Sequence, residues 1–335
     1  MIISKTPFRV SFFGGGTDYP SWYHTHGGAV LSTTINKYTY VTCRWLPPFF
    51  PHKHRVVYSK LEDVRSPYEI IHPSINAVLS AYNPEKGIEL HTDADLPARS
   101  GLGSSSAFLV GLLHSMEALM GRRVTPMWLA KEAIRFEQNV LAEHVGSQDQ
   151  VAAAFGGLNV IQFERDDEIS VRPVIISKAR KKLLNNHLML FFTGFSRSAS
   201  EVAQVQIKNI DNRTAELRKI YSMVHDALDI LSSETDIRHF GEMLHEAWMF
   251  KRSLSSRITS DRIDEIYDRA RQAGAIGGKL LGAGGGGFFL LFVEPDKQQA
   301  VKDALKHYLY QGSRRRVRMR LRSAAGSGTP ARTGT

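Results

Sequence analysis

The stretch "LPARSGLGSSSA" at residues 96–107 carries residue types that bind phosphate. Gly101 and Gly103 free the backbone for close approach, and three serines then open an apolar segment that predicts a buried helix over 104–121. A helix N-terminus offers unpaired N–H groups and the positive end of the helix dipole, which together bind anions. Serine hydroxyls there can cap the helix or bind a Mg²⁺ ion carried by a phosphate. A glycine turn with a serine cap is the alternative, because short glycine motifs recur by chance.

A second glycine-rich stretch, "SFFGGGTDYP" at residues 11–20, places three glycines just before an acid. Adjacent glycines weaken a helix or a strand, because each loses more backbone freedom on folding than any other residue. Their presence at 14–16 indicates that another group must approach bare backbone there. Asp18 supplies a carboxylate beside that place.

The third stretch, "GAGGGG" at residues 282–287, formally satisfies the pattern G-x-G-x-x-G. The dinucleotide fingerprint needs a strand before the glycines and a helix after them. Here a helix is predicted before the glycines and the strand "FFLLFV" after them, so the order is reversed. A Walker A loop is excluded too, because Ala273 stands where its first glycine belongs and Leu280 where Ser or Thr must bind magnesium.

Apolar periodicity predicts the elements that would position these stretches. A cap-plus-proline start at Thr125 and Pro126 opens one of the helices. The pattern is typical of an α+β protein, with a domain boundary near 175–185 and no internal repeat. The predicted strands are 2–13, 37–46, 55–59, 88–96, 187–193 and 288–293, and the predicted helices are 104–121, 126–141, 198–232, 236–254, 261–273 and 295–310.

Composition predicts a soluble globular protein, since 42% of the 335 residues are hydrophobic and 23% are charged. No apolar run approaches the roughly 18 residues of a membrane span. The first residues are interrupted by Lys5, Pro7 and Arg9, which argues against a signal peptide. A single cysteine, Cys43, excludes an internal disulfide and favours a cytoplasmic location.

The net charge of +10 is concentrated at the end of the chain. Residues 313–335 contain seven arginines and no acid, which leaves 36 basic and 33 acidic residues elsewhere. A nucleic-acid-binding protein would carry its basic residues on folded elements, so nucleic acid is not an expected partner. The composition of 313–335 predicts a disordered basic tail.

The three glycine-rich stretches carry a family resemblance. "PFRVSFFGGGTDYP", "PARSGLGSSSA" and "KLLGAGGGGF", in this order, resemble the three motifs of the GHMP small-molecule kinase superfamily, which includes galactokinase, homoserine kinase and mevalonate kinase. The resemblance spans residues 7–288. Within the superfamily, "GGGTDYP", "GSQDQ" and "FTGFSRSA" most resemble kinases of D-glycero-D-manno-heptose 7-phosphate.

The resemblance implies a two-lobed GHMP kinase fold of the α+β class. An N-terminal lobe like ribosomal protein S5 domain 2, at residues 1–180, would contain the phosphate loop and the catalytic aspartate. A ferredoxin-like C-terminal lobe would occupy residues 181–312. The active site would lie between the lobes.

The resemblance also implies a catalytic pair. Asp149, in "GSQDQ", matches the aspartate that takes or orients the proton of the attacking hydroxyl. Arg9 matches a basic residue beside it, which would hold Asp149 ionised and offset charge on the transferring group. From residue type alone, a helix cap at Asp149 and a strand-surface arginine at Arg9 are the alternatives.

ATP and Mg²⁺ would be bound at the second motif. Ser105 matches the family's metal-binding serine, with Glu137 as its carboxylate partner. The residues three and four positions away from Glu137 are apolar, so a carboxylate there is costly unless a cation pairs with it. A pairing with Lys or Arg is the alternative. The predicted nucleotide-binding residues are Gly101, Leu102, Gly103, Ser104, Ser105 and Ser106.

The first motif would line the sugar pocket, with the ring on bare backbone and Asp18 accepting hydrogen bonds from its hydroxyls. Galactokinases carry Glu-His where this chain has Gly15 and Gly16, which leaves room for a larger or differently oriented sugar. A sugar phosphate also needs a second cationic site. The predicted acceptor-binding residues are Gly15, Gly16, Thr17, Asp18, Arg197, Lys251, Arg252, Gly284 and Gly285.

The sequence thus predicts an ATP- and Mg²⁺-dependent sugar kinase. Its acceptor would be the anomeric hydroxyl of heptose 7-phosphate, giving the 1,7-bisphosphate for nucleotide-activated heptose in bacterial surface polysaccharides. ATP and the sugar phosphate are the expected partners, without nucleic acid or membrane, and a homodimer stays open. The alternatives are a kinase of an unphosphorylated sugar, such as a fucose or a hexuronic acid, and a binding protein that keeps the fold without catalysis.

Overall fold

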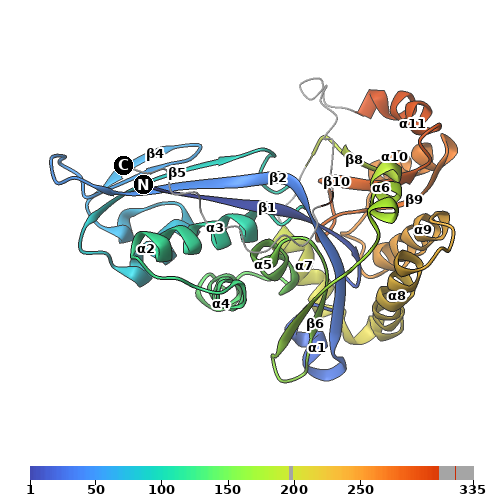
Figure 1. The fold of residues 1–335 in the computed structure, drawn as a ribbon, viewed down its shortest axis with the longest axis horizontal. Coiled ribbons are helices and arrows are strands. Elements are labelled where there is room, and N and C mark those ends of the chain that lie inside the picture. Colours follow the sequence, from blue (N-terminus) through green and yellow to red (C-terminus); the bar gives the residue numbers. More distant parts are fainter. Residues whose placement is uncertain (196–198, 309–320, 322–335) are drawn as a thin grey trace.

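Two β-sheets, each covered by helices, organise the chain (Figure 1). The structure is a computed structural model that describes residues 1–195, 199–308 and 321. It confirms the predicted α+β class. Among these residues no helix is long and apolar enough to cross a membrane.

The first sheet is organised around β2 (Gly28–Leu46), a 19-residue strand rich in β-branched and aromatic residues. β1 pairs with it antiparallel along nearly its whole length, from Ile2 opposite Cys43 to Phe13 opposite Leu31. On the other side, the first half of β2 pairs with β6 and the second half with β5. The remaining strands extend the order β4-β3-β5-β2-β6-β7. Their bounds are β1 Ile2–Phe13, β3 His54–Val57, β4 Leu61–Val64, β5 Gly87–Ala94, β6 Leu158–Phe163 and β7 Ile169–Pro173.

Helices α2, α3, α4 and α5 lie on one side of this sheet (Figure 1). The residues of α3 are buried almost all round, and the helix packs against β1 and β2. Its first turn therefore has a fixed position relative to the end of β1. The helices of this lobe are α1 Pro20–His26, α2 Pro73–Tyr82, α3 Ser104–Leu119, α4 Pro126–Arg135, α5 Gln148–Phe155 and α6 Lys178–His187.

The chain passes from the first sheet to the second through α6. The second sheet has, in the described part of the chain, three antiparallel strands in the order β8-β10-β9, and α9 packs against β9. Its elements are β8 Leu188–Phe192, α7 Ala199–Lys208, α8 Thr214–Ser232, α9 Arg238–Ser253, α10 Asp261–Gln272, β9 Ala275–Leu280, β10 Phe288–Val293 and α11 Gln298–Leu305.

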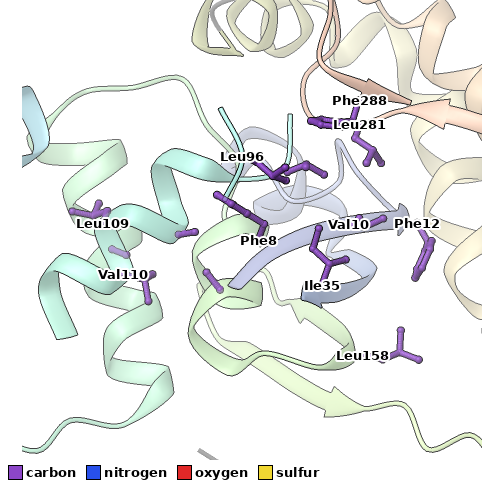
Figure 2. Packing of buried hydrophobic residues seen from close by; sticks show 14 of the residues in the cluster. Phe8, Val10, Phe12, Ile35, Leu96, Leu109, Val110, Leu158, Leu281 and Phe288 are labelled. Atoms are coloured by element: carbon purple, nitrogen blue, oxygen red, sulfur yellow. The ribbon is translucent and has the colours of Figure 1, made fainter. Parts of the chain in front are cut away.

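The two lobes share a hydrophobic core at the end of β1. The ring of Phe240, on α9, meets Phe12 and Phe13 edge to face at centroid distances of 5.3 and 5.2 Å. Leu281 and Phe288, from the second sheet, lie beside Leu96 of the first lobe (Figure 2). This shared core fixes the second and third glycine-rich stretches next to each other, where the Phe288 N–H donates to the Ser100 carbonyl oxygen at 3.1 Å.

Several elements of the structure differ from the prediction. Strand β9 was not predicted, so the third glycine-rich stretch connects two antiparallel strands rather than following a helix directly. Its glycines hide the strand pattern, and packing explains them: a Cβ on Gly277 would lie 1.9 Å from the Gly241 carbonyl oxygen of α9. The helix predicted over 198–232 is broken by a 3-10 turn at Asp211–Arg213. The helix from Pro126 is α-helical to Arg135 and then forms a π-helical turn, Phe136–Val140.

The predicted tail at 313–335 lies outside the described residues except for Leu321. That residue is buried, with 5% of its surface exposed, and forms a β-bridge with Ile35. Its N–H donates to Asn185 Oδ1 at 2.9 Å. Leu321 therefore joins the hydrophobic core, which the basic composition of 313–335 did not indicate.

We expect Leu321→Ala to lower the free energy of unfolding by about 2–3 kcal/mol, the usual loss when a buried leucine is truncated. Truncation after Gly312 should cost at least as much, because it also removes the hydrogen bond to Asn185. Thermal melting of both variants beside the full chain measures the effect. Two unchanged melting temperatures would mean that Leu321 adds nothing to the core.

Candidate active site

A cavity of about 580 Å³ is lined by residues of both lobes and of all three glycine-rich stretches. Arg9 and Asp149 line it together with Ser104, Ser105 and Ser106 at the start of α3. The residues predicted for the site that lie at its wall are Arg9, Gly15, Gly16, Asp18, Gly101, Gly103, Ser104, Ser105, Ser106, Asp149, Lys251 and Gly284.

Arg9 and Asp149 form a bidentate ion pair in this wall. Arg9 Nε and Nη2 donate to the two carboxylate oxygens of Asp149, each at 2.7 Å. Arg9 Nη1 donates to the Gly101 carbonyl oxygen, also at 2.7 Å. The arginine is 4% exposed, whereas the Asp149 side chain is 24% exposed and open to the cavity. The pair is thus held in one geometry with its carboxylate accessible.

The second glycine-rich stretch brings the N-terminus of α3 to this pair. Gly103 precedes the helix in the left-handed region, with φ +71°, and a Cβ there would lie 3.2 Å from both Arg9 Cγ and Asp149 Oδ2. Only glycine fits without strain or displacement of the pair. Leu102 is fully buried and outside the cavity wall, and its carbonyl oxygen accepts the Arg9 N–H. Its predicted role in nucleotide binding is therefore limited to its backbone.

Glu137 lies on the π-helical turn and is 2% exposed. Its Oε2 accepts hydrogen bonds from Ser106 Oγ, at 2.7 Å, and from Gln150 Nε2. Burial raises the pKa of this carboxyl to about 7, against the lowering effect of those two hydrogen bonds. The alternative of a Lys or Arg partner is wrong, since the observed partners are neutral.

Of the adjacent serines, Ser106 rather than Ser105 contacts Glu137. Ser106 is buried and bonded to the carboxylate, whereas Ser105 is exposed at the cavity wall. Successive residues of a helix differ by about 100° in direction, so the two hydroxyls cannot share one role. No hydrogen bond joins Ser105 to Glu137 among the described residues, so the metal-binding role predicted for Ser105 stays a prediction.

These residues fit a Mg²⁺ ion that is bound mainly through a nucleotide. Within the described ranges no group of three or more His, Cys, Asp and Glu side chains could hold a metal by itself. Mg²⁺ often binds to one or two protein oxygens and completes its shell with phosphates and waters. The hydroxyls of Ser105 and Ser106 line the cavity at the α3 N-terminus, and Glu137 lies behind Ser106, outside the wall but bonded to that hydroxyl. The raised pKa of Glu137 also fits, because a cation would stabilise its ionised form.

The three glycines of the first stretch have different environments. A Cβ on Gly14 would lie 1.9 Å from the Ala29 carbonyl oxygen, so this glycine permits close packing of the chain on β2. A Cβ on Gly16 would lie 2.9 Å from Gln206 Nε2, the end of a flexible side chain, and Gly16 also lines the cavity. A Cβ on Gly15 would make only ordinary contacts, at 3.7 Å, and Gly15 lines the cavity as well. The expectation of bare backbone for a ligand thus fits Gly15, whereas internal packing accounts for Gly14.

Thr17 and Asp18 also differ in role. Thr17 is fully buried and its hydroxyl donates to backbone carbonyl oxygens of Gly14 and Ala29, so its predicted contact with the acceptor is wrong. Asp18 lines the cavity and accepts the N–H groups of Gly16 and Gln148, at 2.9 and 3.3 Å. Burial raises the pKa of the Asp18 carboxyl.

The predicted cations for a sugar phosphate separate in the structure. Lys251 is buried at the cavity wall. Arg252 lies outside that wall and pairs with Asp264 at 2.9 Å, so it is not available to a ligand in the cavity. Its direction follows from the helix, since Lys251 continues the buried stripe of α9 and the next residue points away from it. Arg197 lies outside the described residues.

The third stretch lines the cavity with partly different residues from those predicted, namely Gly282, Ala283, Gly284 and Gly286. Gly284 lines it, but Gly285 does not, and the Gly285 N–H donates to the Ile258 carbonyl oxygen at 2.8 Å. Gly282 lies against the second stretch, because a Cβ there would be 2.7 Å from Gly101 Cα. Close contact between the two loops is therefore one reason for these glycines.

Three cavity residues were missed from the sequence. Lys279 is buried, and its Nζ donates to the Phe12 carbonyl oxygen at 2.9 Å. Ser11 Oγ and Gln148 Oε1 are buried atoms that have no hydrogen-bond partner among the described residues. Both lie next to Gly15, where a Cβ would be 3.7 Å from Ser11 Oγ and from Gln148 Nε2. Their positions in the quoted motifs were visible, but their burial without a partner was not.

Comparison with known proteins agrees with this geometry. Residues 69–157 match the GHMP kinases N terminal domain, and residues 224–311 match GHMP kinases C terminal. Together the matches contain the start of α3, Glu137, Asp149, both cavity lysines and the third glycine-rich stretch.

Individual relatives extend over nearly the whole chain. A D-glycero-alpha-D-manno-heptose 7-phosphate kinase of Campylobacter jejuni is 28% identical over 91% of this chain and 93% of its own length. A galactokinase of Pyrococcus furiosus is 24% identical over 92% and 94%. The crystal structure of a D-glycero-D-manno-heptose 1-phosphate kinase from Bacteriodes thetaiotaomicron superposes with a TM-score of 0.75, at 26% identity, over 92% of this chain and 93% of the other.

Proposed function

We propose that this chain, which belongs to the GHMP kinases and is an ATP-dependent sugar kinase, phosphorylates the anomeric hydroxyl of D-glycero-D-manno-heptose 7-phosphate. The observation that carries the proposal is the Arg9–Asp149 pair in the cavity wall, between the N-terminus of α3 and the open backbone of Gly15. A phosphate on one side and an alcohol on the other would both reach Asp149.

The residues support transfer of the γ-phosphoryl group of ATP. A bond forms between the acceptor oxygen and the γ-phosphorus, and the bond from that phosphorus to the β,γ-bridging oxygen breaks. Asp149 takes the proton that the acceptor hydroxyl loses, and Arg9 keeps the carboxylate in place to receive it. The N–H groups at the start of α3 would hold the phosphates. Bound Mg²⁺ would neutralise phosphate charge, held by Glu137 with Ser105 or Ser106.

The choice of a heptose phosphate rests on the relatives' names and on the acceptor side of the cavity. Two relatives that cover nearly the whole chain are described as kinases of a heptose phosphate, although their names give different phosphate positions. Gly15 has no side chain at the cavity wall, and Ser11 Oγ and Gln148 Oε1 have no hydrogen-bond partner among the described residues, which sugar hydroxyls would supply. These features fit a polyhydroxylated acceptor.

A substrate panel in a coupled assay of ADP release tests the proposal. We expect kcat/KM for heptose 7-phosphate to exceed that for the unphosphorylated heptose at least ~10-fold, because a hydrogen bond to a charged group contributes about 1.5–3 kcal/mol. Galactose, fucose and glucuronate should be poorer acceptors.

The methyl glycoside of heptose 7-phosphate is the matched control for the position of transfer. It keeps the phosphate but blocks the anomeric oxygen, so it should release no ADP above background. A wild-type preference for a free sugar would contradict the heptose 7-phosphate assignment, and turnover of the methyl glycoside would contradict the anomeric position.

A further inference from the structure

Two buried lysines line the cavity without a role in the reaction described above. Lys251 and Lys279 are 8% and 5% exposed. Lys251 Nζ donates to the carbonyl oxygens of Leu280 and Gly282, at 2.9 and 2.5 Å, and Lys279 Nζ donates to that of Phe12. In the part of the chain that the structure describes, neither amine forms an ion pair. When these amines are protonated, their positive charges have carbonyl dipoles as partners, but no counter-ion among the described residues.

A buried ammonium group without a counter-ion is unfavourable, and carbonyl partners offset only part of the cost. Each ammonium has three N–H donors. Lys251 uses two of them and Lys279 uses one, so three donors remain at a wall that faces the cavity. A ligand that carries several negatively charged oxygens would satisfy both the charges and the donors.

The positions of the two amines indicate which kind of anion would bind between them. Lys251 is bonded to Gly282, which lies against Gly101 of the phosphate-binding stretch. Lys279 is bonded to Phe12, just before the glycines that face the acceptor. The charged groups around Lys251 are Lys279, Arg9, Asp18 and Asp149, and those around Lys279 are Arg9 and Asp18. Asp149 is engaged by Arg9 and Asp18 by backbone N–H groups, so neither carboxylate neutralises the lysines.

We propose that Lys251 and Lys279 together bind a phosphoryl group at the junction of the phosphate loop and the acceptor pocket. The assignment to a kinase substrate rests on the proposed function. Two sources share this chemistry, the γ-phosphate of ATP and the phosphate already present on the acceptor.

Anion binding at this site should be coupled to proton uptake, which a purely structural role of the two lysines would not produce. Burial lowers the pKa of Lys279 to about 7, with a further lowering by Arg9 and an opposing effect of Asp18. The pKa of Lys251 is also well below its usual range, through burial and then through the charges of Lys279 and Arg9. A bound anion raises both pKa values. Above pH 7, binding should therefore draw protons onto the amines.

Calorimetric titration with sodium sulfate at pH 8, in two buffers of different ionisation enthalpy, tests this directly. Sulfate resembles a phosphoryl group but does not titrate near neutral pH. We expect wild type to take up about one proton or more on binding. Lys279→Gln and Lys251→Gln keep a hydrogen-bond donor for the carbonyl partners but lose the charge. Each should weaken sulfate at least ~10-fold and reduce the proton uptake.

Lys131→Gln is the matched control, because Lys131 lies on α4 in an exposed pair with Glu168. It should bind sulfate as wild type does. If a glutamine variant does not melt cooperatively, the methionine variants replace it, and the proton uptake of wild type still stands as a test. Sulfate binding without proton uptake in wild type, or with unchanged affinity in both lysine variants, would overturn the proposal.

Two pairs of ligands then identify the source of the phosphoryl group. A non-hydrolysable ATP analogue against ADP reports the γ-phosphate, and heptose 7-phosphate against heptose reports the acceptor's phosphate. If the lysines bind the γ-phosphate, their variants should no longer bind the ATP analogue more tightly than ADP. If they bind the acceptor's phosphate, the variants should no longer bind heptose 7-phosphate more tightly than heptose. Unchanged preferences in both pairs would contradict a phosphoryl site at the two lysines. If wild type does not bind heptose 7-phosphate, the proposed function fails, whereas the sulfate and nucleotide titrations still decide the lysines.

Discussion

Replacing Asp149 with Asn should lower kcat at least ~100-fold and leave ATP binding nearly unchanged. Asparagine keeps the shape of the side chain but cannot accept the proton of the acceptor hydroxyl, and general base catalysis typically contributes 10²–10⁴-fold. The substitution leaves the proposed nucleotide contacts at 101–106 untouched, so the loss should appear in kcat rather than in the KM for ATP. Single-turnover assays and nucleotide titration measure the two quantities separately.

The matched control is Asp264→Asn. Asp264 also pairs with an arginine, Arg252, but the two lie outside the cavity wall. This variant should keep wild-type turnover, which separates loss of the base from loss of an ion pair in general. Asp149→Asn protein that melts cooperatively and turns over near the wild-type rate would refute the catalytic assignment.

The Arg9–Asp149 pair shows what a motif can predict that local pattern cannot. The two residues are 140 positions apart, and neither residue type nor periodicity indicates that they touch. Their pairing followed from the resemblance of the surrounding motifs to a family. The structure adds the reason for the glycine at 103, where a side chain would collide with both partners.

The lysines show a signal that the sequence did contain. Leu244, Ala247, Trp248 and Lys251 share the buried face of α9 at helical spacing, so Lys251 belongs to the core side and Arg252 does not. Treating the two as equal candidates ignored that spacing. Lys279 had no comparable signal, because the glycines of β9 remove the alternation that marks a strand.

For Glu137, the sequence indicated burial but not the residue that binds its carboxylate. The apolar residues around it correctly indicated a buried carboxylate in need of a partner. The partner itself depended on geometry that the sequence does not fix, because the π-helical turn Phe136–Val140 changes the direction of the side chain. A one-residue difference along α3 then decides that Ser106, and not Ser105, meets it.

Glu137→Gln should raise the Mg²⁺ concentration for half-maximal rate at least ~10-fold, because it removes a charged oxygen ligand but keeps the side-chain volume. Ser105→Ala and Ser106→Ala, measured in the same way, identify the hydroxyl that serves the metal. Glu117→Gln is the matched control, since Glu117 is also a buried glutamate but is bonded to Tyr82 away from the cavity. An unchanged metal dependence in the Glu137 variant would place the ion elsewhere.

The pKa of Glu137 also predicts the direction in which the Mg²⁺ requirement should change with pH. Because burial raises the pKa of Glu137 to about 7, the carboxyl is mostly protonated below that pH and must lose its proton before it binds a cation. The Mg²⁺ concentration for half-maximal rate should therefore rise as the pH falls below 7 and level off above it. Without metal, the folded state holds this proton more tightly than the unfolded state, so the free energy of unfolding should fall as pH rises from about 4.5 to 7. Both trends should disappear in Glu137→Gln and persist in Glu117→Gln. If the Mg²⁺ requirement of wild type changes with pH in the same way as that of Glu137→Gln, Glu137 does not bind the ion.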